Sequence, residues 1–264
     1  MTLATAPCRE RKGGEDVTDF FDGPEQLVVA HRGLALDYPE NTIPAFRAAL
    51  DAGADILETD VHASLDGVAM VSHDPTLKPV ASRREAVHHH SAETLASFDL
   101  GGATMPTLAE VLEEFPDTRF SVDVKHPAAL WPTINLLRAM NATHRVMVAS
   151  FTPRLRAEAI AALPPIANCA TSDQIIPSYF ASRASLSGLA QRILSGVNAV
   201  FVPPSWWGID LTHPRFIDAI SAAGATSGVW TINDPDEMTA LWQRGVRAII
   251  TDRTDLAIAA RSAL

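Results

Sequence analysis

The chain has 264 residues, of which 47% are hydrophobic and 20% charged, and its formal net charge is −10. This composition is typical of a soluble globular protein, and the length suits one large α/β domain or two smaller ones. The negative charge argues against a nucleic-acid partner or an anionic membrane surface, because both select for basic patches. A phosphate substrate stays open, since its binding depends on the local charges of a pocket.

Residues 1–24 are predicted to form a flexible arm. Charged residues between Arg9 and Lys12 interrupt this stretch, so it resembles neither a secretory signal nor a membrane span. No later window holds eighteen uninterrupted apolar residues, and Cys8 and Cys169 make no disulfide framework. We therefore expect a cytoplasmic protein without stable membrane insertion, with one folded domain over residues 25–264.

Short apolar runs rich in β-branched residues alternate with helical patterns through this domain. Strands are predicted at Leu27–Ala30, Ile56–Val61, Arg119–Val124, Val146–Ser150, Ala167–Thr171, Ala199–Val202, Thr226–Thr231 and Ala248–Thr251. Helices are predicted at Thr42–Asp51, Leu108–Glu114, Ala128–Met140, Pro153–Ala162, Arg183–Leu194, Pro214–Ala223 and Pro235–Arg244, and after Thr254. This alternation predicts a (β/α)8 TIM barrel, with a doubly wound open sheet as the alternative.

Two segments interrupt the alternation. Residues 74–105 contain no clean strand, and we predict that they form a small insertion after the second strand, beside the mouth of the barrel. Val68–Ser72 is a candidate extra strand that pairs with the second through a turn at Asp66 and Gly67. The irregular stretch 203–208, with two adjacent tryptophans, follows the sixth strand.

Carboxylates occur near the ends of neighbouring predicted strands. Glu58 and Asp60 are two residues apart on the second strand and therefore face the same side. Asp123 lies near the end of the third strand. In a barrel these ends surround the active site, and carboxylate oxygens are the ligands that Mg²⁺ and Ca²⁺ prefer. The sequence therefore predicts a site for Mg²⁺ or Ca²⁺ on these three residues.

Basic side chains occur at the same rim. His31 and Arg32 end the first strand, Lys125 follows the third, and His73 follows the extra strand. Histidine titrates near neutral pH and serves as a general acid or base, whereas arginine and lysine bind phosphoryl oxygens. The set points to a metal-assisted phosphodiesterase. Each residue alone is more often structural, and Asp123 in particular could merely pair with Lys125, so the interpretation depends on their coincidence.

These residues lie in motifs that resemble the glycerophosphodiester phosphodiesterase family. The motifs are His31-Arg32-Gly33, Pro39-Glu40-Asn41-Thr42, Glu58-Thr59-Asp60, His73-Asp74-Pro75, Pro106-Thr107-Leu108, Trp230-Thr231-Ile232-Asn233-Asp234 and Thr251-Asp252-Arg253. The resemblance covers residues 28–256 in the family's order. It implies a TIM barrel and a metal-dependent hydrolase that releases glycerol 3-phosphate and an alcohol from glycerophosphodiesters.

The resemblance also implies residue roles. His31 and His73 would be the acid–base pair, and Glu58 and Asp60 would bind the metal. Arg32 and Lys125 would contact the phosphate, and we expect Trp230 to contact the substrate as well. We favour His31 as the base, although the order of the histidines and the choice between water and a glycerol hydroxyl as nucleophile stay open.

The chain departs from the family pattern at Asp123, where the family usually has glutamate, and at Thr254, where it often has proline. The shorter arm of Asp123 places its role as a metal ligand in question. Two other functions stay open on the sequence alone. One is a lysophospholipase D-like phosphodiesterase that uses Trp206 and Trp207 for apolar contact, and the other is an inactive barrel that binds a phosphorylated metabolite.

Overall fold

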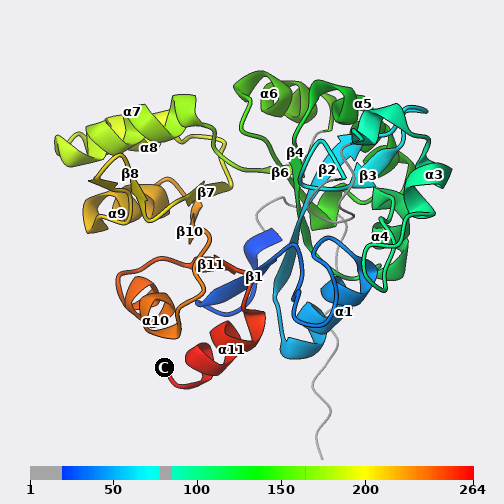
Figure 1. The fold of residues 1–264 in the computed structure, drawn as a ribbon. Coiled ribbons are helices and arrows are strands. Elements are labelled where there is room, and N and C mark those ends of the chain that lie inside the picture. Colours follow the sequence, from blue (N-terminus) through cyan, green and yellow to red (C-terminus); the bar gives the residue numbers. More distant parts are fainter. Residues whose placement is uncertain (1–19, 78–84, 164) are drawn as a thin grey trace, which may run out of the picture.

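The computed structural model describes residues 20–77, 85–163 and 165–264 (Figure 1). Within these ranges eight parallel strands form a sheet in the order β6–β5–β4–β2–β1–β11–β10–β7. Their bounds are β1 (Leu27–His31), β2 (Ile56–Ala63), β4 (Phe120–Val124), β5 (Val146–Ala149), β6 (Ala167–Asn168), β7 (Ala199–Val202), β10 (Thr226–Val229) and β11 (Ala248–Thr251). A bridge between Cys169 and Ala199 connects the two ends of this order. The predicted (β/α)8 barrel is confirmed.

Helices surround the strands (Figure 1). They are α1 (Ile43–Ala52), α3 (Ala92–Ala96), α4 (Leu108–Glu114), α5 (Pro127–Ala139), α6 (Pro153–Ala162), α7 (Ser172–Arg183), α8 (Ser187–Ile193), α9 (Pro214–Ala222), α10 (Pro235–Gln243) and α11 (Thr254–Ser262). Short 3-10 turns are η2 (Val87–His89) and η3 (Thr143–Arg145). Thr42 caps α1 by accepting a hydrogen bond from the Ala45 amide, and Gly53 ends the helix with φ 104°. None of the described helices is both long and apolar enough to cross a bilayer.

Strand register places the polar residues opposite one another on neighbouring strands. His31 pairs with Glu58 across β1 and β2, and Asp60 pairs with Asp123 across β2 and β4. The strands are buried on both faces, as in a parallel sheet covered by helices. Because the strands are parallel, their carboxyl ends open at the same side of the barrel.

The predicted helix at 183–194 is confirmed over its C-terminal part, whereas a helix before it was not predicted. The structure has α7 over Ser172–Arg183 and the separate α8 over Ser187–Ile193, joined at Ser185, which has a positive φ of 62°. Pro177 lies inside α7, an unusual position because proline lacks the backbone N–H that an interior helical residue donates. A small hairpin, β8 (Ser205–Trp206) with β9 (Ile209–Asp210), begins in the stretch 203–208 that we expected to be irregular and ends just after it.

The predicted arm over residues 1–24 needs a correction at its end. Residues 1–19 lie outside the described residues, but Phe20 and Phe21 are buried, at 2% and 6% exposure, among residues of the barrel interior. Arg119 donates a hydrogen bond to the carbonyl of Phe20. The packed chain therefore includes Phe20 and does not begin at residue 25.

The segment 74–105 follows β3 (Ala69–Val71), the antiparallel neighbour of β2. Residues 78–84 lie outside the described ranges. The described part contains η2 and α3 and has its own apolar cluster, which includes Met70, Leu77 and Leu95. This cluster attaches the segment to β3 beside the barrel.

Candidate active site

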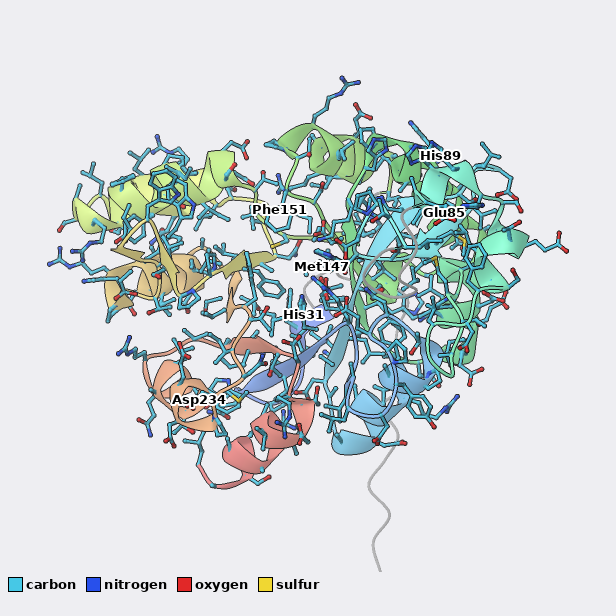
Figure 2. The ribbon with its side chains drawn as sticks, viewed as in Figure 1. His31, Glu85, His89, Met147, Phe151 and Asp234 are labelled. Carbon is cyan, nitrogen blue, oxygen red and sulfur yellow. The ribbon has the colours of Figure 1, made fainter. Side chains whose placement is uncertain are left out.

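A cavity of about 410 Å³ opens at the carboxyl ends of the strands. The site residues predicted from the sequence all line it: His31, Arg32, Glu58, Asp60, His73, Asp123, Lys125 and Trp230. His31 lies near the centre of the ring of strands, whereas His89 lies at the periphery (Figure 2). The structure thus brings together the residues that the sequence nominated, while their chemical roles stay predictions.

The backbone after β1 explains how two consecutive side chains reach the cavity. Successive residues of a strand point to opposite faces. Arg32 leaves strand geometry with a positive φ of 60°, so both His31 and Arg32 face the mouth. Gly33 continues the turn with φ 89°, and a Cβ there would lie 2.7 Å from the carbonyl carbon of Ala45. Only glycine lets α1 approach this closely.

His31 is held by an acidic partner that the sequence placed at the rim without a role. Its Nδ1 lies 2.6 Å from Oδ1 of Asp252, which follows β11. The other oxygen of Asp252 accepts a hydrogen bond from Asn233 Nδ2 at 2.8 Å, and Asn233 Oδ1 accepts one from the Asp252 amide. Burial would raise the pKa of Asp252, but the hydrogen bonds from His31 and Asn233 lower it. A charged Asp252 fixes the orientation of the imidazole and leaves Nε2 free for proton transfer.

Lys125 lies between two carboxylates. Its Nζ is 2.8 Å from Oδ1 of Asp60 and 2.7 Å from Oδ2 of Asp123. Arg32 approaches the other oxygen of Asp60, with Nε at 3.1 Å, and also pairs with Glu40 at 2.9 Å. The cations at this end of the cavity are therefore fixed in place by buried acidic groups.

The three carboxylic acids of the site differ in the direction of their pKa shifts. Burial, together with the charges of Asp60 and Asp123, raises the pKa of Glu58 well above its usual range. Burial also raises the pKa of Asp123 in spite of Lys125. Burial alone would raise the pKa of Asp60, but Lys125 and Arg32 hold it below its usual value. The charges of Lys125 and Arg32 therefore stabilise the ionised form of Asp60, but they do not fully offset the burial of Glu58 and Asp123.

Whether these carboxylates fit a divalent cation depends on their free oxygens. In the described part of the chain, no three His, Cys, Asp or Glu side chains already have the arrangement of a metal site. Asp123 Oδ1, however, is buried without a hydrogen-bond partner, and Glu58 is destabilised as an anion by its acidic neighbours. Buried oxygens of this kind are suitable ligands for a hard cation. The donor chemistry therefore fits Mg²⁺ or Ca²⁺.

His73 reaches the cavity from the loop after β3. The ring of His62, on β2, is 3.1 Å from the carbonyl oxygen of His73 through Nε2 and ties this loop to the barrel. Burial lowers the pKa of His62, which favours a neutral ring. His62 was not identified from the sequence, since nothing in the local pattern of β2 separates it from a core position.

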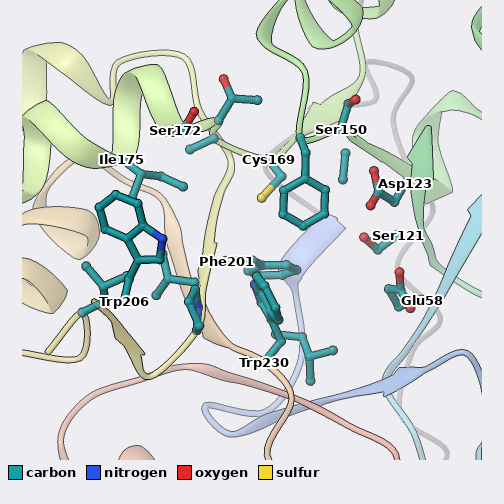
Figure 3. Close-up of a pocket in the computed structure, with 18 of the residues that line it drawn as sticks. Glu58, Ser121, Asp123, Ser150, Cys169, Ser172, Ile175, Phe201, Trp206 and Trp230 are labelled. Atoms are coloured by element: carbon teal, nitrogen blue, oxygen red, sulfur yellow. The ribbon is translucent and has the colours of Figure 1, made fainter. Parts of the chain in front are cut away.

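The opposite half of the cavity is apolar, and of its residues only Trp206 was considered for substrate contact in the sequence analysis. Figure 3 shows Glu58, Ser121 and Asp123 on one side and Ile175 and Trp206 on the other, with Phe201 and Trp230 between them. Cys169 also lines the cavity, but burial raises the pKa of its thiol to about 12, so it stays a neutral thiol. Residues of α7 form much of the apolar side.

Comparison with known proteins agrees with this geometry. The sequence model of the glycerophosphoryl diester phosphodiesterase family matches residues 31–256. A relative from Mycobacterium tuberculosis, named probable glycerophosphodiester phosphodiesterase 2, is 32% identical over 247 residues, which cover 92% of this chain and 94% of the relative.

Solved structures show the same fold. A glycerophosphodiester phosphodiesterase from Agrobacterium tumefaciens aligns with a TM-score of 0.74 and 26% identity over 90% of this chain and 99% of its own. A phosphodiesterase from Oleispira antarctica, in complex with the product sn-glycerol-3-phosphate, aligns with a TM-score of 0.73 and 22% identity over 89% and 96%. The chain belongs to the glycerophosphoryl diester phosphodiesterase family.

Proposed function

We propose that this enzyme hydrolyses glycerophosphodiesters to sn-glycerol 3-phosphate and an alcohol at the charged end of the cavity. The observation that carries the proposal is the convergence of two histidines, two fixed cations and three carboxylates on one cavity at the carboxyl ends of the strands. The family membership and the product bound to the Oleispira relative support the same reaction.

Arg32 and Lys125 are suited to bind the non-bridging phosphoryl oxygens. Both are held by acidic partners before substrate arrives, so little reorganisation is needed when charge develops during the reaction. Burial opposes the charge of Lys125, yet Asp123 and Asp60 raise its pKa. The lysine is therefore a stable cation at neutral pH.

Glu58, Asp60 and Asp123 would hold a divalent cation, Mg²⁺ or Ca²⁺. Such an ion supplies Lewis-acid stabilisation of the phosphoryl group when it is bound. The support comes from the unpartnered Asp123 Oδ1 and the raised pKa of Glu58. A bound cation would also relieve the mutual repulsion of the three acidic groups.

The histidines divide the proton transfers. With Nδ1 of His31 bonded to Asp252, its Nε2 is the nitrogen that takes a proton from the attacking oxygen. This arrangement supports His31 as the base and leaves His73, on the loop after β3, to protonate the leaving alkoxide. The assignment of nitrogens follows from the hydrogen-bond partners.

The test is the rate of glycerol 3-phosphate formation from glycerophosphocholine with Mg²⁺ or Ca²⁺ present. His31→Ala and His73→Ala should each lower kcat by at least about 100-fold with the fold intact, which is typical of general acid–base groups. His88→Ala, an exposed histidine outside the cavity, should keep wild-type activity. A folded His73→Ala protein with normal kcat would refute the acid–base assignment.

We also propose a cytoplasmic location. The support is the cysteine usage, because Cys169 is a buried free thiol and the sequence has only one other cysteine. Fractionation of cells that produce the protein at its native level checks this, and recovery outside the cytoplasm would contradict it.

A further inference from the structure

Two asparagines hold two of the aspartates at the carboxyl ends of the strands. Asn41 donates from Nδ2 to Oδ2 of Asp60 at 3.2 Å, and its Oδ1 accepts a hydrogen bond from the Thr59 hydroxyl at 2.8 Å. We call these three residues the arginine clamp, because Asp60 also pairs with Arg32 at 3.1 Å. The hydroxyl keeps the amide nitrogen, which is the donor, directed at the carboxylate.

The same arrangement occurs on the other side of β1. Asn233 donates from Nδ2 to Oδ2 of Asp252 at 2.8 Å, and its Oδ1 accepts a hydrogen bond from the Thr251 hydroxyl at 3.0 Å. We call these three residues the histidine clamp, because Asp252 also holds His31 at 2.6 Å. In the sheet, β1 lies between β2 and β11 (Figure 1). The two clamps therefore flank the strand whose end carries His31 and Arg32.

The two clamps occupy equivalent positions of two β/α units. In each, the asparagine directly precedes the residue that caps a helix, which is Thr42 before α1 and Asp234 before α10. In each, the threonine follows the asparagine by 18 residues, lies in the next strand and directly precedes the aspartate. Adjacent residues of a strand point to opposite faces, so a third group has to connect the threonine to the aspartate. The repeated spacing indicates that both asparagines serve the same purpose.

The threonines and asparagines of the clamps act at one remove from the chemistry. The described residues that line the cavity include none of these four. Thr59 and Thr251 are both 0% exposed, and Asn41 is 5% exposed. Breaking a hydrogen bond between such groups is destabilising, because the partner left behind has no water to bond instead. Each clamp therefore favours a single orientation of its aspartate.

We propose that the two clamps are separate positioning devices, one for the guanidinium of Arg32 and one for the imidazole of His31. The inference rests on the proposed function, because these side chains would bind the phosphate and take the proton. Oδ2 of Asp60 is 3.2 Å from the amide nitrogen of Asn41 and 3.1 Å from Nε of Arg32. The amide thus restricts where this oxygen, and with it the guanidinium, can lie.

The histidine clamp works through both oxygens of Asp252. Oδ2 accepts the hydrogen bond from Asn233, and Oδ1 lies against Nδ1 of His31. A carboxylate that is held on one oxygen does not rotate freely, so the other oxygen stays directed at the imidazole. The backbone amide of Asp252 also donates to Asn233 Oδ1 at 2.9 Å, which fixes the asparagine amide. Because the clamps share no residue, loosening one should leave the side chain held by the other in place.

The experiment removes one hydroxyl at a time. Thr59→Val and Thr251→Val keep the shape of the side chain, whereas Thr59→Ser and Thr251→Ser keep its hydroxyl. Thr133→Val is the matched control, because Thr133 is 1% exposed and donates its hydroxyl hydrogen bond to the Ala129 carbonyl within α5. Thr59→Ala or Thr251→Ala takes the place of a valine variant that does not fold.

The direct readout is nitrogen NMR of the metal-free protein without substrate. The signals followed are Nε of Arg32, identified by its loss in Arg32→Lys, and the ring nitrogens of His31, identified by their loss in His31→Ala. We expect Thr59→Val to shift the arginine signal only and Thr251→Val to shift the histidine signals only. The serine variants should return both to their wild-type positions, and Thr133→Val should move neither.

Turnover of glycerophosphocholine with saturating Mg²⁺ or Ca²⁺ gives a second readout. Thr59→Val should act mainly on KM, because Arg32 contributes to phosphate binding, and Thr251→Val mainly on kcat, because His31 moves the proton. Each effect should be about 3- to 10-fold, which corresponds to the loss of one hydrogen bond. A merely structural role would lower stability without dividing KM from kcat in this way.

The outcomes separate this inference from the proposed function. If either valine variant moves both NMR signals, or neither, the two separate clamps are overturned. The NMR experiment needs no turnover, so it still decides the clamps if the wild-type protein hydrolyses no diester and the proposed function fails. Signals that shift as expected while kcat and KM stay at wild-type values would overturn the positioning role and leave the function standing.

Discussion

Asp252 acts on His31 and does not contact the phosphate in our account. Its carboxylate is bonded to His31 Nδ1 on one side and to Asn233 on the other. Asp252→Asn should therefore lower kcat by at least about 10-fold, since the loss is about 10- to 100-fold for carboxylate partners of metal-bound histidines and about 10,000-fold beside the catalytic histidine of serine proteases. KM should change little, because substrate binding depends on other side chains. Steady-state kinetics with glycerophosphocholine gives both constants.

The control for this variant is Asp255→Asn, three residues further along. Asp255 pairs with Arg253 and has no contact with His31. It should leave both constants near wild type. An Asp252→Asn protein with unchanged kcat would show that the hydrogen bond to His31 is structural only.

Asp123 is the position at which the chain departs from its family. An aspartate projects its carboxylate less far than a glutamate, and Ca²⁺ tolerates irregular geometry better than Mg²⁺. We expect Ca²⁺ to bind at least as tightly as Mg²⁺, Asp123→Glu to shift the preference toward Mg²⁺, and Asp123→Ala to weaken both. Calorimetric titration of metal-free protein measures this without turnover. Unchanged affinity in Asp123→Ala would mean that Asp123 serves only to pair with Lys125.

At the level of elements, the sequence predicted the helices and strands whose signals lie within a short stretch of the chain. The helix Leu108–Glu114 was placed correctly from its helical pattern, and the structure shows that Thr107 and Glu110 form a capping box at its start. Helix α7 was missed because both of its faces are used. One side packs against α8 and α9, where Tyr179 contacts Phe216, and another lines the cavity with Ile175 and Ile176. Such a helix has no single apolar stripe, so its contribution to the apolar half of the cavity could not be predicted either.

Gly228 shows how two strands shape the cavity. A Cβ at Gly228, on β10, would clash with the ring of Phe201 on β7, which lines the cavity. Gly228→Ala should force this ring to move and lower the free energy of unfolding by about 1–3 kcal/mol, as overpacking does. Chemical denaturation measures the loss.

Gly188→Ala provides the matched control, because Gly188 lies in α8 and a Cβ added there would enter open space. Here the substitution should raise the free energy of unfolding by about 0.5–1 kcal/mol, the usual gain from alanine in a helix. If Gly228→Ala were as stable as wild type, the close approach of Phe201 would not constrain the strand.

At the level of the whole molecule, the alternation of strand and helix patterns along the chain predicted the barrel and most of the charged site. Residues near strand ends, such as Glu58 and Lys125, could be assigned to the site because the carboxyl ends of all strands of such a barrel lie on the same side. The contribution of Phe20 and Phe21 was not predicted, since their burial depends on contacts with residues about 100 and 226 positions away, such as Arg119 and Arg247. Local periodicity holds no information on contacts of that range.

The buried aromatic pair at the start of the packed chain should stabilise the barrel as a whole. Phe20→Ala removes a side chain that is 2% exposed and stacks edge-on against Phe21. We expect the free energy of unfolding to fall by about 3–5 kcal/mol, as for other buried phenylalanines. Trp131→Ala, at 52% exposure, should cost much less in the same denaturant titration. Equal losses of unfolding free energy in the two variants would contradict the claim that the burial of Phe20 stabilises the barrel.

The central claim is that the charged end of the cavity cleaves a glycerophosphodiester on the alcohol side. Phosphorus NMR of glycerophosphocholine incubated with the wild-type protein and Mg²⁺ or Ca²⁺ follows this bond directly. Our account predicts that the diester signal is replaced by that of glycerol 3-phosphate, with one choline released for each phosphate monoester. Two results would contradict it. One is the appearance of phosphocholine and glycerol, and the other is a diester signal that the wild-type protein leaves as unchanged as the His31→Ala protein does.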